Sequence, residues 1–472
     1  MAAQGVRFFL QMGSTVVLAR LLTPQDFGLI AMVAAVTGFV AMFKDMGLSM
    51  ATVQKAEINH GQISTLFWIN VVLSLCVMLV IAALAPAIAW FYNEPRLTWI
   101  TLALAGAFIF GGLTVQHQAL LRRQMHFGIL AAVEITSMTV SILAAIISAF
   151  CGAGYWSLVI MQLAGAVTHT VAVWFACEWR PGLPVRRSGV REMLAFGGNL
   201  TGFNLMNYFA RNADNLLIGK FWGPGQLGLY SKAYALLMLP LQQITGPVAA
   251  VAIPTLSRLQ NDPERYRRYY YRAISMIAFI TMPLVAMLAA LSHEVITIVL
   301  GKQWTDSAII FKVLAFAAIF QPIWSTIGWI YVSLGQTKRL MYWGLVMVPL
   351  IVISFLIGLP WGGLGVATSY TLCYLSLIMV PSFWYAFRYS PVSVTDLFRT
   401  IRCPLVLGLA MYCATELMRR FAAVDSLVLT VVYCCALGIC VFALGLVVWP
   451  RARGEAFNVL RTGKLLRKPS TV

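Results

Sequence analysis

Fourteen apolar segments run along this chain, each close to the ~20 residues that an α-helix needs to cross a lipid bilayer. Hydrophobic residues make up 60% of the 472 positions and charged residues only 11%, so the excess apolar surface must face lipid. Lipid offers backbone groups no hydrogen-bond partners, and spanning segments must therefore be helical. The sequence predicts an all-α, polytopic membrane protein with about fourteen transmembrane helices, at residues 2–22, 27–44, 65–91, 97–115, 129–150, 154–177, 194–219, 226–253, 273–291, 308–334, 340–359, 363–387, 400–418 and 426–449.

The lysine and arginine residues predict the orientation, because cytoplasmic loops of membrane proteins are rich in both. Four of the 34 lie within the segments, namely Arg7, Arg211, Lys232 and Lys312. If the N-terminus is inside, the outer loops hold six: Arg20, Arg96, Lys220, Lys302, Arg419 and Arg420. The other 24 fall on the side of both termini, which we therefore expect to be cytoplasmic. Cations held at lipid headgroups account for the net charge of +18, and no nucleic-acid partner is needed.

A short motif occurs twice, two hundred residues apart. The copies share a cation, a proline, a glycine and a leucine at the same offsets: Arg20, Pro24, Gly28 and Leu29, then Lys220, Pro224, Gly228 and Leu229. Such turns could recur by chance between membrane helices, but four matched positions favour a duplicated helical hairpin. We expect an N-terminal six-helix bundle at 1–178, a cytoplasmic linker at 179–193, a C-terminal six-helix bundle at 194–387, and two extra transmembrane helices with a basic cytoplasmic tail at 388–472.

The seventh segment carries the most polar side chains. Asn204, Asn207 or Tyr208, and Arg211 recur at helical spacing and share one face. Asp214 follows Arg211 at i+3, close enough to pair with it. Polar groups within membrane spans usually face the bundle interior or a water-filled cavity. We favour a cavity-lining role over a satisfied buried ion pair, although the two are compatible.

Two further cations and one further carboxylate complete the candidate site. Arg7 and Lys232 could join Arg211 in binding an anion such as phosphate or pyrophosphate. Arg7 could instead belong to the cytoplasmic flank, and Lys232 could simply extend to the interface. Glu134 and Asp214 are candidates for a coupling-ion site that takes a proton or a sodium ion, but Asp214 could equally neutralise a neighbouring cation.

Catalytic and cofactor motifs are missing from the sequence. It contains no GxSxG, HExxH or GxxxxGK[ST] pattern, and its nine cysteines make no CxxC pair or Cys/His ligand set. The predicted outer loops are short, whereas membrane glycosyltransferases and ligases usually carry a large one. We therefore expect a transporter with no catalytic residues, no metal and no cofactor.

Four stretches resemble a known family: Ala19–Leu29, Gln62–Val71, Arg211–Gly219 and Pro254–Gln260. Together they are similar to Wzx-type, and in particular WzxC-like, polysaccharide flippases of the MOP superfamily. The resemblance implies two pseudo-twofold six-helix bundles plus two extra helices, in the bacterial cell inner membrane. It also implies alternating-access transport of undecaprenyl-pyrophosphate-linked oligosaccharide repeat units to polysaccharide polymerase machinery, for exopolysaccharide or O-antigen export. The family's cationic cavity suits Arg211, with Arg7 and Lys232.

Other functions stay open from the sequence. A multidrug exporter of the same superfamily would share the fold, but a cation exporter should have an acidic cavity. A polytopic polysaccharide polymerase or ligase would need an outer loop with paired catalytic groups. A lipid scramblase would need no coupling ion.

Overall fold

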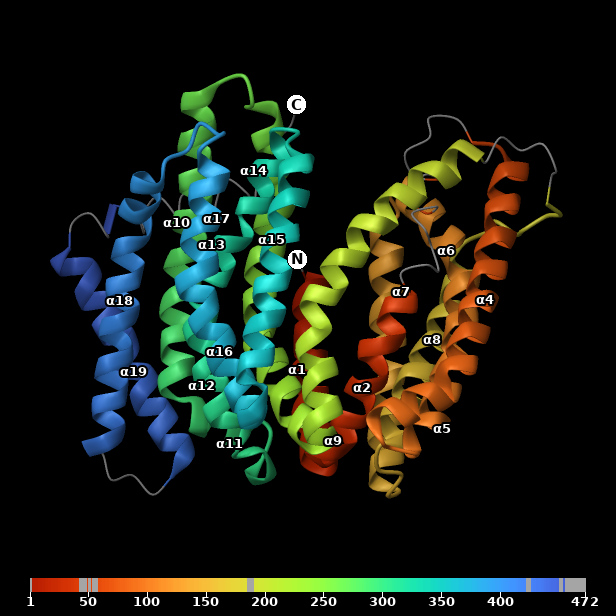
Figure 1. Cartoon of the computed structure of the whole chain (residues 1–472), viewed down its shortest axis with the longest axis horizontal. Helices are drawn as coiled ribbons and strands as arrows, with labels where there is room; N and C mark the ends of the chain where they lie inside the picture. Colours follow the sequence, from red (N-terminus) through yellow and green to blue (C-terminus); the bar gives the residue numbers. More distant parts are fainter. Residues whose placement is uncertain are drawn as a thin grey trace. The chain divides into compact units, whose positions relative to one another are not determined.

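The computed structural model describes residues 2–41, 49, 52, 58–184, 191–421, 426–449 and 453–454, and for residues 2, 41, 191–207, 209–211 and 337 it describes the backbone alone. Throughout these residues the chain forms helices joined by short connections, and none of them lies in a β-strand (Figure 1). The predicted all-α class is confirmed. The chain divides into two compact units, Met1–Gly228 and Leu229–Val472.

In its described residues the first unit contains seven helices and the beginning of an eighth: α1 (Ala2–Leu21), α2 (Pro24–Ala41), α4 (His60–Tyr92), α5 (Arg96–Ala105), α6 (Ala107–Arg123), α7 (Phe127–Phe150), α8 (Trp156–Ala176) and the part of α9 (Arg191–Arg258) that precedes residue 229. In this unit α7 packs along α8 and also against α1, while α4 packs against α5 and α6. The α1–α2 turn is closed by Asp26, whose carboxylate accepts hydrogen bonds from the Thr23 backbone N–H (2.8 Å) and hydroxyl (2.7 Å).

The second unit continues α9 and adds α10 (Pro263–Ala290), α11 (Ser292–Val299), η1 (Lys302–Trp304), α12 (Ser307–Ala318), α13 (Gln321–Ser325), α14 (Ile327–Ser333), α15 (Thr337–Gly358), η2 (Leu359–Trp361), α16 (Gly362–Cys373), the π-helical turn η3 (Tyr374–Ile378), α17 (Met379–Phe387), α18 (Val394–Phe421) and α19 (Leu427–Val448). Its core is built around α10, which packs against α18 and α12. The buried hydroxyls of Tyr266 and Tyr270 bond to Ser333 (2.7 Å) and Thr326 (2.9 Å). The extra helices α18 and α19 pack against each other (Figure 1).

By length and composition, nine helices in the described residues could cross a membrane, or ten if the bent pair α12 and α13–α14 is one span. Two of these helical stretches, Asn212–Arg258 and Lys338–Phe387, each cover two of the predicted segments. α9 is 68 residues long and kinks at Gly223, between the seventh and eighth predicted segments. The described part of every predicted segment is mostly helical, with a break at Gly106 in the fourth segment and breaks between α12, α13 and α14 in the tenth. The chain is therefore a multi-pass membrane protein, and the number of fourteen crossings stays a prediction.

The chain that follows α8 packs against the first unit. The α8 helix ends at Ala176, and residues 177–184 fold back onto the start of α4. Trp179 donates its indole N–H to His60 Nδ1 (3.1 Å), and Gly182 N–H donates to Ser64 Oγ (3.0 Å). The compact units divide later, at Gly228, so the predicted domain boundary at 179–193 stays a prediction.

Candidate functional site

The two copies of the duplicated turn pack against each other within the first unit. A Cβ built on Gly28 would overlap the carbonyl group of Pro224 and lie 2.9 Å from its Cα. A Cβ built on Gly228 would overlap the carbonyl group of Pro24 in the same way. The second copy sits where α9 kinks at Gly223, whose φ of 77° and ψ of −178° favour glycine. Each copy thus presents its glycine to the other copy's proline, as a twofold relation between duplicated hairpins requires.

Further contacts hold the chain around this pair of turns. Lys220, the cation of the second copy, donates a hydrogen bond to the carbonyl of Phe91 and lies 5.0 Å from the centre of the Phe91 ring. At the start of α5, the Arg96 guanidinium makes two 2.8 Å hydrogen bonds to the carboxylate of Glu94. This bidentate contact lowers the pKa of Glu94 below its usual range. Three cations predicted on the outer side (Arg20, Arg96 and Lys220) belong to the helix ends and turns of this unit.

Arg7 and Glu134, predicted for different roles, form an ion pair. Arg7 Nη2 of α1 lies 2.5 Å from Glu134 Oε2 of α7, and the side chains are 30% and 52% exposed. Within the described residues, the buried Nε of Arg7 has no hydrogen-bond partner. The Arg7 guanidinium therefore keeps an N–H that could donate to another group. The negative charge of Glu134 lies next to it and would affect the binding of any anion there.

Tyr208 attaches α9 to α2. Its hydroxyl lies 2.9 Å from the carbonyl oxygen of Ala34 and 3.0 Å from that of Ala35, so its one proton is shared between two acceptors. Gly38 permits this approach, because a Cβ there would overlap the Tyr208 hydroxyl and lie 2.9 Å from the ring carbon Cζ. The hydroxyl is therefore engaged by backbone, and the half-buried ring is the part of Tyr208 left to line a site.

The other candidate residues divide between the two units. Asp214, 8% exposed in the first unit, accepts a 2.8 Å hydrogen bond from the Asn215 backbone N–H. Lys232 is half-buried and belongs to the second unit. The side chains of Asn204, Asn207 and Arg211 lie outside the described residues, although their backbone is helical. The structure therefore brings Arg7 and Glu134 together and shows Tyr208 of α9 bonded to the backbone of α2. The predicted substrate and coupling-ion roles of all these residues stay predictions.

Several polar groups outside the predicted site also gather near helix ends. Glu94 and Arg96 are one example, and the buried Glu294 with Glu416 and Arg419 is another. The i,i+3 spacing of Glu416 and Arg419 could have revealed that pair, but Glu294 lies on α11 and shares no local spacing with them. Over the part of the chain that the structure describes, no three His, Cys, Asp or Glu side chains are placed to hold a metal ion.

Solved structures define the class of fold to which this arrangement belongs. The chain superposes on the lipid II flippase MurJ in an inward closed conformation with a TM-score of 0.76, at 15% identity, over 95% of this chain and 98% of MurJ. It superposes on an inward-facing multidrug resistance MATE family transporter of the MOP superfamily with a TM-score of 0.65, at 14% identity, over 81% of this chain and 94% of the transporter. The protein therefore has the fold of MOP-superfamily membrane transporters, as the resemblance implied.

Sequence comparison then gives the family. Residues 17–309 match the profile of the polysaccharide biosynthesis protein family, and the chain belongs to that family.

Curated relatives agree with this assignment. The chain is 28% identical to the teichuronic acid biosynthesis protein TuaB of Bacillus subtilis (strain 168), over 65% of this chain and 64% of TuaB, so the match spans just under two thirds of that relative. It is 25% identical to the lipopolysaccharide biosynthesis protein WzxC of Escherichia coli (strain K12), over 75% of this chain and 73% of WzxC. It is 24% identical to the succinoglycan biosynthesis transport protein ExoT of Rhizobium meliloti (strain 1021), over 93% of this chain and 89% of ExoT. The predicted resemblance to Wzx-type proteins is confirmed.

Proposed function

We propose that this protein flips undecaprenyl-pyrophosphate-linked oligosaccharide repeat units across the bacterial inner membrane by alternating access, for exopolysaccharide or O-antigen export. The observation that carries the proposal is the combination of a polysaccharide biosynthesis family match with a fold shared with a lipid II flippase. A fold alone does not define a substrate. The names of the relatives, a lipopolysaccharide biosynthesis protein and a succinoglycan biosynthesis transport protein among them, support a substrate from polysaccharide biosynthesis.

Arg211 is the proposed main contact for the pyrophosphate. Arginine can bind phosphate oxygens through two parallel hydrogen bonds, and a low-dielectric surrounding strengthens them. The amides of Asn204 and Asn207 would bond to sugar hydroxyls, and Lys232, which belongs to the second unit, stays a predicted substrate-binding cation. The ring of Tyr208 would pack against a sugar, since its hydroxyl is held by α2.

The ion pair of Arg7 with Glu134 supports a coupling step. While Glu134 is charged, it holds Arg7 at 2.5 Å. Binding of a proton or a sodium ion to Glu134 would weaken that attraction and free the Arg7 guanidinium for an anion. Asp214 is the second proposed carboxylate of this step, because it is nearly buried in the same unit.

The proposed flippase function also implies an orientation in the membrane, a downstream partner and transport without catalysis. Both termini would be cytoplasmic, as the distribution of lysine and arginine predicts. The transported repeat unit would pass to polysaccharide polymerase machinery on the outer side. The protein would transport its substrate without chemical conversion, in line with the transport named for its relative ExoT.

Proteoliposomes test the proposal directly. The purified protein would be reconstituted with a fluorescent prenyl-pyrophosphate-linked disaccharide, and a membrane-impermeant quencher would report how much of the probe lies in the outer leaflet. We expect the protein to speed exchange between leaflets and Arg211→Ala to slow it by roughly tenfold or more, as loss of a buried charged contact would. Arg402→Gln, which removes an exposed charge from α18, is the matched control. Equal exchange with and without protein would refute the proposal.

A further inference from the structure

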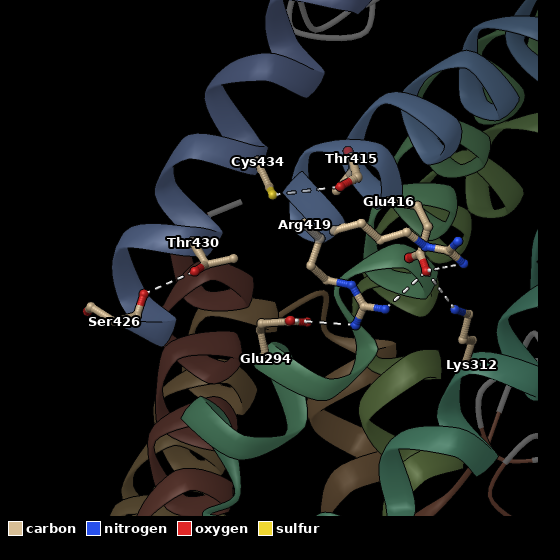
Figure 2. A network of polar contacts seen from close by, with 9 residues as sticks. Glu294, Lys312, Thr415, Glu416, Arg419, Ser426, Thr430 and Cys434 are labelled. Carbon is tan, nitrogen blue, oxygen red and sulfur yellow. Dashed lines mark hydrogen bonds and ion pairs between the residues drawn. The ribbon is translucent and has the colours of Figure 1, made fainter. Parts of the chain in front are cut away.

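Three cations surround a single carboxylate oxygen in the second unit (Figure 2). Arg419 Nη2 lies 3.0 Å from Glu416 Oε1, Lys312 Nζ lies 3.7 Å from it, and Arg420 Nη2 lies 3.8 Å from it. Lys312 comes from α12, whereas the other three residues lie within the last turns of α18. The four residues form what we call the α18 cation cluster.

Lys312 and Arg420 keep hydrogen-bond donors beyond their ion pairs with Glu416, although Lys312 Nζ also lies 5.7 Å from the centre of the Tyr412 ring. Only the 3.0 Å contact of Arg419 with Glu416 is a hydrogen bond, because the other two distances exceed hydrogen-bonding range. Neither Lys312 nor Arg420 donates a hydrogen bond to another described residue. Their side chains are 29% and 73% exposed, so a group from outside the protein can reach them. Lys312 and Arg420 can therefore contact an anion from outside the protein, while the buried Oε2 of Glu416 has no hydrogen-bond partner among the described residues.

A buried carboxylate fixes the position of Arg419. Glu294 of α11 has a side chain only 6% exposed, and its Oε1 lies 3.6 Å from Arg419 Nη1 (Figure 2). With Glu294 included, three cations face two carboxylates, which leaves an excess of one positive charge. Removing Arg419 would leave Glu294 buried without its partner, so Arg419 is also needed for stability.

The surroundings of the cluster indicate a lipid. Arg419 and Arg420 are two of only six cations predicted in the outer loops, where the positive-inside rule disfavours them. On the same last turns of α18, Leu417 is 59% exposed and Phe421 is 80% exposed. Apolar side chains beside cations at a helix end are suited to acyl chains and a phosphate headgroup, respectively.

We propose that Lys312, Arg419 and Arg420 bind the phosphate group of a membrane lipid at the end of α18, and that Glu416 occupies the place of that anion when no lipid is bound. Arginines would bind the phosphate oxygens in a bidentate way and Lys312 as a point charge. The phosphate could belong to a phospholipid headgroup or to a prenyl pyrophosphate. This proposal does not depend on the transport function proposed above.

Lipid binding to the purified full-length protein in detergent, measured by native mass spectrometry with phosphatidylglycerol as the probe, tests the site. We expect Lys312→Gln with Arg420→Gln to weaken binding by about tenfold or more, since each basic residue near an anionic headgroup is worth about fivefold. Glu416→Gln should strengthen binding several-fold, because it removes the competing internal anion while keeping the side-chain shape. Arg402→Gln removes one exposed charge about 27 Å away along the same helix and should change nothing.

A lipid-binding site predicts weaker lipid binding for the double variant and stronger lipid binding for Glu416→Gln. This difference in sign distinguishes a binding site from an ion network that only stabilises the fold. A network alone predicts that Glu416→Gln lowers stability without any gain in lipid binding, and that result would overturn the proposal. If the double variant fails to fold, Arg420→Gln alone can test the site, because the Arg420 side chain is 73% exposed and its loss should leave the fold intact.

Competition with farnesyl pyrophosphate then distinguishes the two sources of the phosphate group. Displacement of phosphatidylglycerol supports a prenyl-pyrophosphate ligand, and retention supports a phospholipid headgroup.

Discussion

The backbone of Gly28 packs directly against Pro224, and Gly228 packs against Pro24 in the same way. Residues two hundred positions apart thus make reciprocal contacts at equivalent places in a repeated motif. A close backbone approach of this kind leaves room only for hydrogen on each glycine. The contact joins the α1–α2 turn to the kink of α9 at Gly223 within one compact unit.

Adding a methyl group at either glycine should force the two turns apart. We expect Gly28→Ala and Gly228→Ala each to destabilise the protein by about 1–3 kcal/mol, the usual cost of overpacking a tight contact. Thermal unfolding of the purified variants would measure the change. Gly225→Ala is the matched control, since a Cβ at Gly225 meets nothing within 4 Å. Equal unfolding temperatures for all three variants would contradict the packing described for these turns.

The Arg7–Glu134 pair separates a structural role from a functional one. If it served only to join α1 to α7, the exchange Arg7→Glu with Glu134→Arg would restore whatever either single change removes. We expect instead that the exchanged protein reaches normal levels but exports little polymer, because the cation then lies on α7. Export measured against protein level in the membrane provides the comparison. Full export by the exchanged protein would remove Arg7 from the proposed site.

The ring and the hydroxyl of Tyr208 should contribute differently: the hydroxyl to stability and the ring to export. Tyr208→Phe removes the hydrogen bond to the Ala34 and Ala35 carbonyls, and we expect it to cost about 1 kcal/mol of stability with export near normal. Tyr208→Ala also removes the ring and should abolish most export. Unfolding temperature and polymer yield of the two variants would be measured side by side. A Tyr208→Phe variant that is stable yet inactive would assign the hydroxyl to the substrate instead.

The Glu94–Arg96 contact gives the unfolding temperature a dependence on pH. Arg96 lowers the pKa of Glu94 in the folded protein. The ion pair therefore stabilises the folded protein fully at pH values above the ordinary pKa of a glutamate carboxyl. That stabilisation is lost as the pH falls through the lower pKa that Glu94 has in the folded protein. We expect Arg96→Gln to narrow the difference in unfolding temperature between about pH 7 and about pH 4. An unchanged difference would show that other carboxylates set the acid response.

Much of the fold could be predicted because lipid imposes a strong constraint on sequence. Every long apolar segment had to be helical, and each is mostly helical in the described residues. The 48° bend between α12 and α13 was not predicted, although Gln321 and Pro322 at the break are a sequence signal for it, because a proline favours the first turn of a new helix. The matched positions of the cation, proline, glycine and leucine revealed the duplicated turns. Their reciprocal contact could not be predicted, because it depends on the packing of α9 against the α1–α2 turn.

The candidate site was harder to predict, because pairing across helices leaves no trace in local spacing. Arg7 and Glu134 each looked unusual within an apolar segment, yet nothing in the sequence joins them. The cluster around Glu416 was missed for a related reason. Its members lie near helix ends, where charges are ordinary, and Lys312 comes from a different helix.

A strain that lacks this gene tests the central claim most directly, through the leaflet in which lipid-linked repeat units accumulate. The account predicts that polymer output is lost and that repeat units collect in the cytoplasmic leaflet of the inner membrane. Repeat units that reach the outer leaflet but stay unpolymerised would contradict it and favour a polymerase or ligase.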